Sequence, residues 1–205
     1  MGNASRMQGA DSLIMNEAKS DAEKVLRAHG FRKGVNGAWL RNTEEEVHQA
    51  AIVSVSRFAP IVFVDLGVLI RERWVDRLQT RAVGGPGSWD LTGRIEDLIA
   101  PTAELEALNM AVEMEPGARK NRIAALFKAA ESTFFDRFKN VEDVRAYATQ
   151  YARKQRPYVN GFTFEYFGLP IPEPGKPEPI IGIQRVMIRP ELRKIRPTSK
   201  KEGHD

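Results

Sequence analysis

The sequence contains no cysteine. This absence excludes disulfides, thiolate metal sites and cysteine nucleophiles, and it fits a protein of a reducing compartment. Histidine is scarce as well, with only His29, His48 and His204 in 205 residues. No two of them are spaced to place both imidazoles on one face of a helix, so we expect no bound metal ion. Any chemistry must come from other oxygen and nitrogen side chains.

Long hydrophobic runs are also missing. The longest apolar stretch, 61–70, is interrupted by Asp65 and is too short for a bilayer, which needs about 20 residues. The first eleven residues, MGNASRMQGAD, are small and polar, whereas a secretory signal has a basic start and an apolar segment. The sequence therefore predicts a cytoplasmic protein without a membrane segment.

Motifs of the common enzyme classes are absent. The glycine-rich loop 84–88 lacks the Gly-Lys-Ser/Thr of a P-loop and the three spaced glycines of a dinucleotide fingerprint. No Gly-x-Ser-x-Gly elbow presents a serine nucleophile, and no second carboxylate repeats at the spacing of a glycosidase pair. We therefore expect no cofactor, and the sequence favours a protein that is not an enzyme.

What the sequence does have is a local excess of positive charge. The chain carries 31 basic and 27 acidic residues, a net charge of +4. Residues 183–205 hold seven basic and three acidic residues, so residues 1–182 carry 24 of each sign and are neutral. The seven basic residues are Arg185, Arg189, Arg193, Lys194, Arg196, Lys200 and Lys201. They are candidate nucleic-acid contacts because such groups can neutralise phosphates, but a solubilising end explains the same counts.

Hydrophobic periodicity indicates one α+β domain over residues 12–156. From Ser12 to His29 apolar side chains recur at helical spacing, and Gly30 follows where a left-handed residue ends a helix. Alternating apolar residues then predict strands at about 38–41, 47–56 and 61–70. The turns between these strands are too short for a parallel crossover. We therefore predict an N-terminal helix and a three- or four-stranded antiparallel sheet.

The second half of this domain reads mainly as helix. The stretch 71–81 either extends the sheet or forms a connector. Apolar residues at helical spacing predict helices at about 119–139 and 141–155, with Asn140 as the cap of the second. We expect these C-terminal helices to cover one face of the sheet.

The segments outside the domain differ in composition. Residues 1–11 are polar and are predicted to be disordered. Eight of the twelve prolines lie between Pro157 and Pro197, so 157–182 is predicted to be a proline-rich segment with little helix. Within it Phe162, Phe164 and Tyr166 alternate as in a short strand. Residues 183–205 form the basic tail.

Asp65 is the most unusual polar residue because it interrupts an apolar strand. If the face of the sheet that carries Asp65 lined a pocket, Asp65 would act as a general base or ligand. Its partners would then be Arg41, Arg57 or His48 on neighbouring strands. The alternative is that its face of the sheet is simply solvated, as one face of an antiparallel sheet often is.

A second candidate surface lies near Trp74. The default role of a tryptophan is packing. An exposed Trp74 beside Arg71 and Arg73 would instead make a binding surface, because tryptophan and arginine dominate protein interfaces.

Several short segments resemble a bacterial family catalogued as domain of unknown function 4304. They are LRAHGFRK (26–33), GAWLR (37–41), VSVS (53–56), VDLGV (64–68), FFDRF (134–138) and VEDV (141–144). The resemblance covers about residues 12–155. The chain departs from the family pattern at 54–57, where Gln-Lys-Ser is usual, and at Asp65, where Asn is usual. The resemblance implies the same fold and compartment, and it implies no catalytic residues.

The function that these observations favour is a non-enzymatic intracellular module that binds another protein. One alternative is a protein that associates with nucleic acid through the basic tail. The other is an enzyme with a sheet-lined pocket around Asp65.

Overall fold

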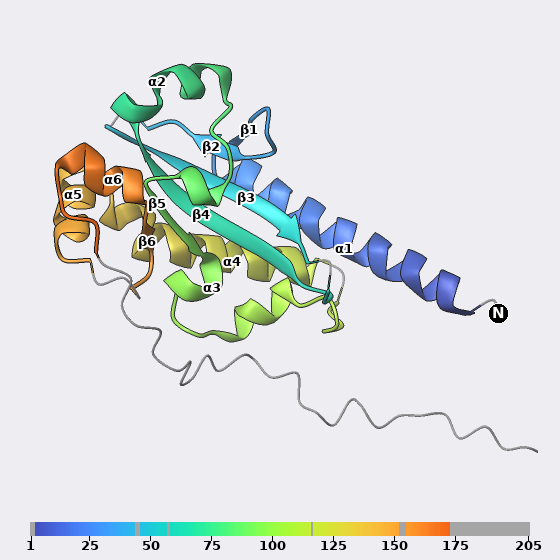
Figure 1. Cartoon of the computed structure of the whole chain (residues 1–205). Coiled ribbons are helices and arrows are strands. Elements are labelled where there is room, and N and C mark those ends of the chain that lie inside the picture. Colours follow the sequence, from blue (N-terminus) through green and yellow to red (C-terminus); the bar gives the residue numbers. More distant parts are fainter. Residues whose placement is uncertain (1–2, 44–45, 57, 116, 152–154, 173–205) are drawn as a thin grey trace, which may run out of the picture. The chain divides into compact units, whose positions relative to one another are not determined.

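The computed structural model describes residues 3–43, 46–56, 58–115, 117–151 and 155–172, with side chains from Met15 onward. The basic tail and residues 173–182 of the proline-rich segment therefore lie outside the described residues. Figure 1 shows the helices and strands of the described part.

The described chain starts with one helix, continues with four strands, and then contains the remaining helices and two further strands. In chain order the elements are α1 (Asn3–Ala28), β1 (Arg32–Lys33), β2 (Trp39–Arg41), β3 (Val47–Val55), β4 (Val62–Ile70), α2 (Arg71–Thr80), η1 (Pro86–Ser88), β5 (Leu91–Arg94), α3 (Ile95–Leu98), η2 (Ala103–Leu108), α4 (Ala118–Thr133), η3 (Phe135–Arg137), α5 (Val141–Thr149), β6 (Tyr158–Val159) and α6 (Gly161–Phe167).

The strands form a six-stranded antiparallel sheet in the order β1-β2-β3-β4-β5-β6. The α+β class, the N-terminal helix and the C-terminal helices are confirmed, but the predicted strand count of three or four is too low. The centre of the sheet is the long β3–β4 pair, which runs from Val47 opposite Ile70 to Val55 opposite Val62. The unexpected strands β1, β5 and β6 have two to four residues, which is too short for an alternating pattern to be visible.

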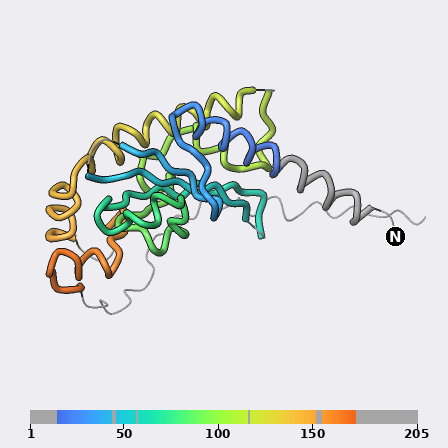
Figure 2. The backbone as a smooth tube through the Cα atoms, turned by 90° about the horizontal axis from the view of Figure 1, so that it is seen from above, coloured from blue at the N-terminus to red at the C-terminus, as the bar shows by residue number. Residues whose placement is uncertain are grey.

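One face of the sheet carries the main core. Figure 2 shows α1 and α4 side by side along this face. Val64, Leu66 and Val68 point into it from β4 and are fully buried, as is Phe127 from α4. Alternation along β4 places these apolar residues on the same face because successive strand side chains point to opposite sides.

A second, smaller apolar cluster covers only part of the other face. It is built around Trp74 of α2, Leu69 of β4 and the fully buried Trp89. Trp89 lies directly on Gly67, where a Cβ atom would be 2.1 Å from the tryptophan ring. Farther along, Phe63 and Asp65 on the same face stay partly exposed.

Local sequence signals explain several helix ends. Gly30 has φ +83° and ends the turn after α1, and the Phe31 N–H donates to Leu26 O at 3.0 Å. α5 starts with a capping box, in which the Asn140 side chain accepts from the Asp143 N–H. α1 itself begins at Asn3, so it includes most of the segment 1–11.

Three stretches differ from their predicted structure. The segment 71–81, read as a strand extension or connector, is mostly the helix α2. The helix predicted over 119–139 is two elements, because α4 ends at Thr133 and the 3-10 turn η3 follows. Phe162, Phe164 and Tyr166 lie on the helix α6, so their prediction as a strand was wrong. The Asn160 side chain accepts from the Phe162 N–H and starts that helix, which the alternation of aromatics does not reveal.

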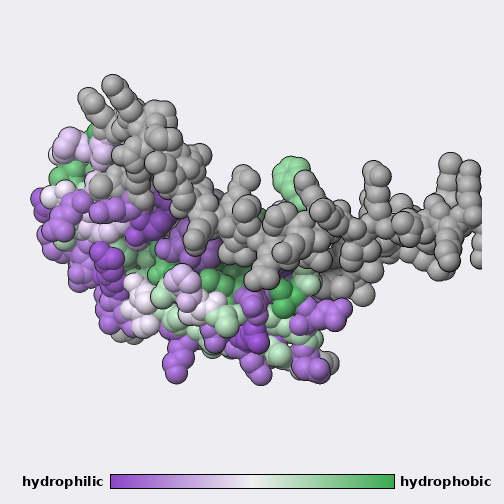
Figure 3. Space-filling view, turned by 90° about the horizontal axis from the view of Figure 1, so that it is seen from below, coloured by the Kyte–Doolittle hydropathy of each residue, from purple (hydrophilic) through white to green (hydrophobic). Residues whose placement is uncertain are grey.

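Apolar side chains also reach the surface. Figure 3 shows them gathered in the middle of the face seen from below, with hydrophilic side chains around them. α3 lies on this side of the molecule in Figure 1, and its Leu98 is only partly buried. In the described part of the chain, no helix combines the length and the apolar character needed to cross a membrane.

Candidate functional site

Asp65 lies on the partly exposed half of the sheet. By register Ile52, Asp65 and Arg94 form one row across β3, β4 and β5. The Arg94 Nε atom is 3.7 Å from Asp65 Oδ1, and the Asp65 side chain keeps 19% of its surface exposed. Burial raises the pKa of Asp65, which the positive charge of Arg94 opposes.

The predicted partners of Asp65 are not brought to it. His48 is on the same face but opposite Leu69, four residues farther along β4, which is about 13 Å at strand spacing. Arg41 is on the other face, where its side chain donates to Gln49 and Glu131, each at 2.6 Å. Arg57 lies outside the described residues. Asp65 therefore does not form the predicted polar site with Arg41 and His48.

The acidic neighbours of Asp65 come instead from α3. Burial raises the pKa of Glu96, and the nearby carboxylates of Asp97 and Asp65 raise it further. Its Oε2 atom is buried without a hydrogen-bond partner. Asp97 pairs with Arg156, whose Nε lies 3.4 Å from Asp97 Oδ2.

Two arginines lie over aromatic rings beside this acidic group. The Arg94 guanidinium is 4.1 Å from the centre of the Phe63 ring, and that of Arg156 is 3.3 Å from the centre of the Tyr158 ring. Phe63 lies two residues before Asp65 on β4, and Tyr158 pairs with Thr92 on β5, two residues before Arg94. We call Phe63, Asp65, Arg94, Arg156 and Tyr158 the arginine–aromatic surface.

Sequence reasoning named only Asp65 of this surface. Arg94 and Tyr158 lie on β5 and β6, which the sequence analysis did not recognise as strands. Arg156 precedes Tyr158 by two residues, a spacing that would have placed both on one face of an extended segment. Recognition of β5 would have required the register with β4, which no local pattern contains.

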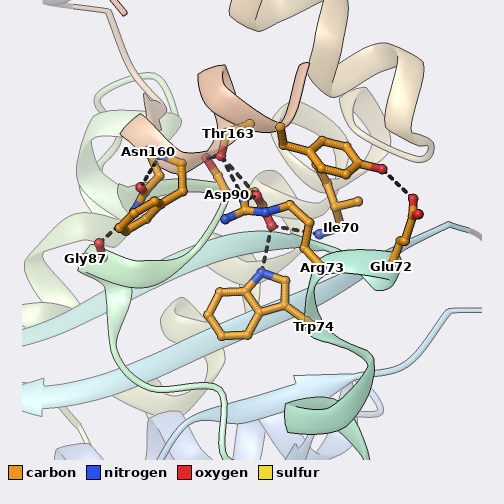
Figure 4. A network of polar contacts seen from close by, with 10 residues as sticks. Ile70, Glu72, Arg73, Trp74, Gly87, Asp90, Asn160 and Thr163 are labelled. Carbon is orange, nitrogen blue, oxygen red and sulfur yellow. Dashed lines mark hydrogen bonds and ion pairs between the residues drawn. The ribbon is translucent and has the colours of Figure 1, made fainter. Parts of the chain in front are cut away.

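Trp74 does not form the predicted exposed surface. It is 5% exposed, and its Nε1–H donates to Asp90 Oδ2 at 2.8 Å (Figure 4). The same oxygen accepts from the Ile70 N–H at 2.9 Å. The other carboxylate oxygen of Asp90 accepts from Arg73 and from the Thr163 hydroxyl. The Asp90 side chain is fully buried, so four donors compensate the loss of water.

This Asp90 network joins three separate parts of the chain. Arg73 and Trp74 come from α2, Asp90 precedes β5, and Thr163 comes from α6. Burial lowers the pKa of Arg73, and the neighbouring Tyr166 is the main group that opposes this decrease. The Tyr166 hydroxyl donates to Glu72 at 2.5 Å, a hydrogen bond that raises the pKa of this tyrosine. The network holds α2 and α6 on the sheet, which is a structural role.

Arg71 is exposed, but its side chain also makes contacts within the protein. Its Nε–H donates to Nε2 of His48 at 3.1 Å, and its Nη2–H donates to Thr43 O at 2.6 Å. The Thr43 N–H faces the other ring nitrogen, Nδ1, of His48 at 3.2 Å. Burial, followed by the charge of Arg71, lowers the pKa of His48. The three residues predicted as a binding surface, Arg71, Arg73 and Trp74, thus contact the protein itself.

Within the described ranges, no three His, Asp or Glu side chains lie close enough to hold a metal ion together. A cavity at the edge of the sheet is lined by Gly30, Arg32, Leu40, Asn42 and Arg81, and Asp65 is not among its lining residues. The seven basic residues of the tail lie outside the described residues.

Comparisons with protein-family models, curated proteins and solved structures found no match for this chain.

Proposed function

We propose that the protein is a non-enzymatic binding module and that the arginine–aromatic surface contacts another protein. Arginine and aromatic side chains are enriched in protein interfaces and contribute most of the energy at their hot spots. Here both types lie together on the part of the sheet face that Trp74 and Trp89 leave uncovered. Tyr158 is 41% exposed and the Arg94 side chain 49% exposed, so both are accessible to a partner.

The ion pairs of this surface favour binding rather than catalysis. Asp65 is held by Arg94, and Asp97 by Arg156, so the charges are matched within the protein. Arginines fixed by a carboxylate and an aromatic ring lose less side-chain freedom when a partner binds. Although Glu96 Oε2 has no hydrogen-bond partner, it is buried, whereas a general base needs a carboxylate within reach of a bound substrate.

The observation that carries this proposal is the pair of arginine–aromatic contacts, and two variants test it. Arg94→Ala and Tyr158→Ala each remove one exposed member of the surface. Arg145→Ala is the matched control, because Arg145 is also an exposed arginine that pairs with a carboxylate, Glu142 on α5. The full chain and each variant are used to purify partners from cells that express the protein. Binding to a recovered partner is then measured with purified proteins.

The expected result is a defined protein that binds the unmodified chain and Arg145→Ala equally. Arg94→Ala and Tyr158→Ala should each raise the dissociation constant of this complex at least tenfold, a loss of affinity typical of a hot-spot residue. If both variants bind the same proteins as the unmodified chain with unchanged affinity, this surface is not the interface.

The nucleic-acid alternative depends on the basic tail and stays a prediction. Deletion of 183–205 should abolish retention on a DNA or RNA column and remove its salt dependence. Retention at full strength after the deletion would exclude the tail as the contact.

A further inference from the structure

A cavity of about 250 Å³ lies where the β1–β2 hairpin meets the end of α2. Arg32 comes from β1 and pairs in register with Leu40 of β2, and Asn42 follows β2. Arg81 is the residue that ends α2. Two arginines, one amide and one leucine thus surround a space of the size of a small organic molecule, and the lining contains no acidic residue.

These two arginines differ from the other arginines of the protein. Every other arginine side chain that the structure describes from Met15 onward donates a hydrogen bond, joins an ion pair or lies over an aromatic ring. In that same part of the chain, the side chains of Arg32 and Arg81 have no such contact. Two exposed arginines without an anionic partner therefore line one cavity.

The backbone of Arg81 gives an independent reason to connect it with a ligand. Its φ of +53° is in the left-handed region, and it is the one described non-glycine residue with a positive φ. Glycine adopts this conformation with less strain, because a Cβ atom there approaches the carbonyl oxygen. Strained non-glycine residues of this kind occur preferentially at ligand-binding and active sites. At Arg81 this conformation also ends α2, where the Arg81 N–H donates to Leu78 O at 3.1 Å.

The wall that carries Arg81 is fixed to the hairpin. The carbonyl oxygen of Arg81 accepts a hydrogen bond from the Val35 N–H at 3.1 Å. A Cβ atom on Gly34 would lie 2.4 Å from the same oxygen, so the two backbones are in close contact. Across the hairpin, the Gly34 N–H donates to Ala38 O at 2.6 Å. The cavity is therefore preorganised, which lowers the cost of binding.

We propose that this cavity binds a small phosphorylated molecule. Arg32 and Arg81 contact the phosphate group, for which the planar guanidinium is well suited because it can donate two parallel N–H bonds. The Asn42 amide and the Leu40 side chain contact the remainder of the molecule. This site is separate from the arginine–aromatic surface and does not depend on it.

Calorimetric titration at constant ionic strength tests the proposal with the full chain. The probes are inorganic phosphate, ribose 5-phosphate and, as the ligand without phosphate, ribose. The expected result is saturable binding of inorganic phosphate, of ribose 5-phosphate or of both, and none of ribose. Tighter binding of ribose 5-phosphate than of inorganic phosphate would identify the ligand as an organic phosphate rather than the free anion.

The variants distinguish a built site from general charge attraction. Arg81→Gly and Arg32→Ala should each raise the dissociation constant at least tenfold, whereas Arg145→Ala, which removes one charge elsewhere, should not change it. Arg81→Gly also relieves the left-handed strain, so its melting temperature should equal or exceed that of the unmodified chain. Failure of both phosphate probes to saturate, or equal loss in all three variants, would overturn the proposal.

Discussion

Arg73 reaches from α2 to the carboxylate of Asp90, which is fully buried beneath it. The contact joins the segment after β4 to the residue before β5, and Thr163 of α6 donates to the same carboxylate. A carboxylate buried in this position needs such donors to replace the water it has lost. The placement of α2 on the sheet therefore depends on one charge that local sequence gives no reason to single out.

Removal of the positive charge at Arg73 should destabilise the protein strongly. Arg73→Met keeps much of the side-chain volume but leaves Asp90 as a buried charge without its counterion, which costs about 3–5 kcal/mol. The free energy of unfolding is measured by urea titration at pH 7. Arg145→Met, which breaks an exposed pair with Glu142, serves as the control and should cost less than about 1 kcal/mol. Equal effects of the two substitutions would show that the Asp90 network contributes little.

Elements with strong local signals were predictable. The helix end at Gly30 follows from the need for a left-handed residue there. Asn140 caps α5 as predicted because its side chain meets a backbone N–H three residues on. The β3–β4 hairpin follows from two alternating apolar runs and a turn too short for a crossover.

Features that depend on distant residues were not predictable. Packing is the default role of a tryptophan, but the sequence does not show what Trp74 packs against, because its contact with Asp90 joins residues 16 positions apart. The aromatics of α6 alternate as in a strand, yet the segment is a helix capped by Asn160. Asp90 itself stands between the buried Trp89 and Leu91, but the polar Ser88 and Thr92 follow on either side, so the local sequence does not mark it.

His48 should make stability depend on pH in mildly acidic solution. Its ring is 6% exposed and faces N–H donors from Arg71 and Thr43, so the neutral form is favoured and the folded-state pKa lies below 6.5. The unfolded chain therefore binds a proton at a higher pH than the folded chain does. The contribution of His48 is complete above about pH 6.5 and is lost as the pH falls below that value toward the folded-state pKa.

The His48 contribution is isolated by comparison with His48→Gln. Urea midpoints are measured from pH 7.5 down to pH 5 for both proteins. The unmodified chain should lose more stability over this range than the variant, since carboxylates that titrate in both proteins cancel in the difference. Parallel curves would mean that His48 is protonated as readily in the folded chain as in the unfolded one.

Arg41 should be sensitive even to replacement by lysine. Its guanidinium donates to the Gln49 side chain at 2.6 Å, to His29 O at 2.9 Å and to Glu131 at 2.6 Å. Although burial opposes the effect, hydrogen bonds from Arg41 and His29 lower the pKa of Glu131. Lysine cannot reproduce this planar set of donors, so Arg41→Lys should cost about 1–2 kcal/mol in urea unfolding. Lys139→Arg, at an exposed pair with Asp136, is the control and should be nearly neutral. If Arg41→Lys leaves the free energy of unfolding unchanged, the contribution of Arg41 to stability comes from its charge alone.

The contact between Gly67 and Trp89 leaves no room for a methyl group. A Cβ atom at Gly67 would lie 2.1, 2.8 and 2.9 Å from three atoms of the Trp89 ring. β4 is paired on both sides and cannot shift alone, so the ring must move, and Asp90 is the next residue in the chain. Gly67→Ala should therefore lower the free energy of unfolding by about 3 kcal/mol and change the near-ultraviolet circular dichroism of the tryptophans.

Gly85→Ala is the matched control for this substitution. A Cβ atom there meets nothing within 4 Å, and the φ of −101° suits any residue. Its free energy of unfolding should stay within about 0.5 kcal/mol of the unmodified chain. If Gly67→Ala is as mild as this control, Trp89 is not packed against β4 in solution, and the smaller apolar cluster cannot be what holds α2 against the sheet.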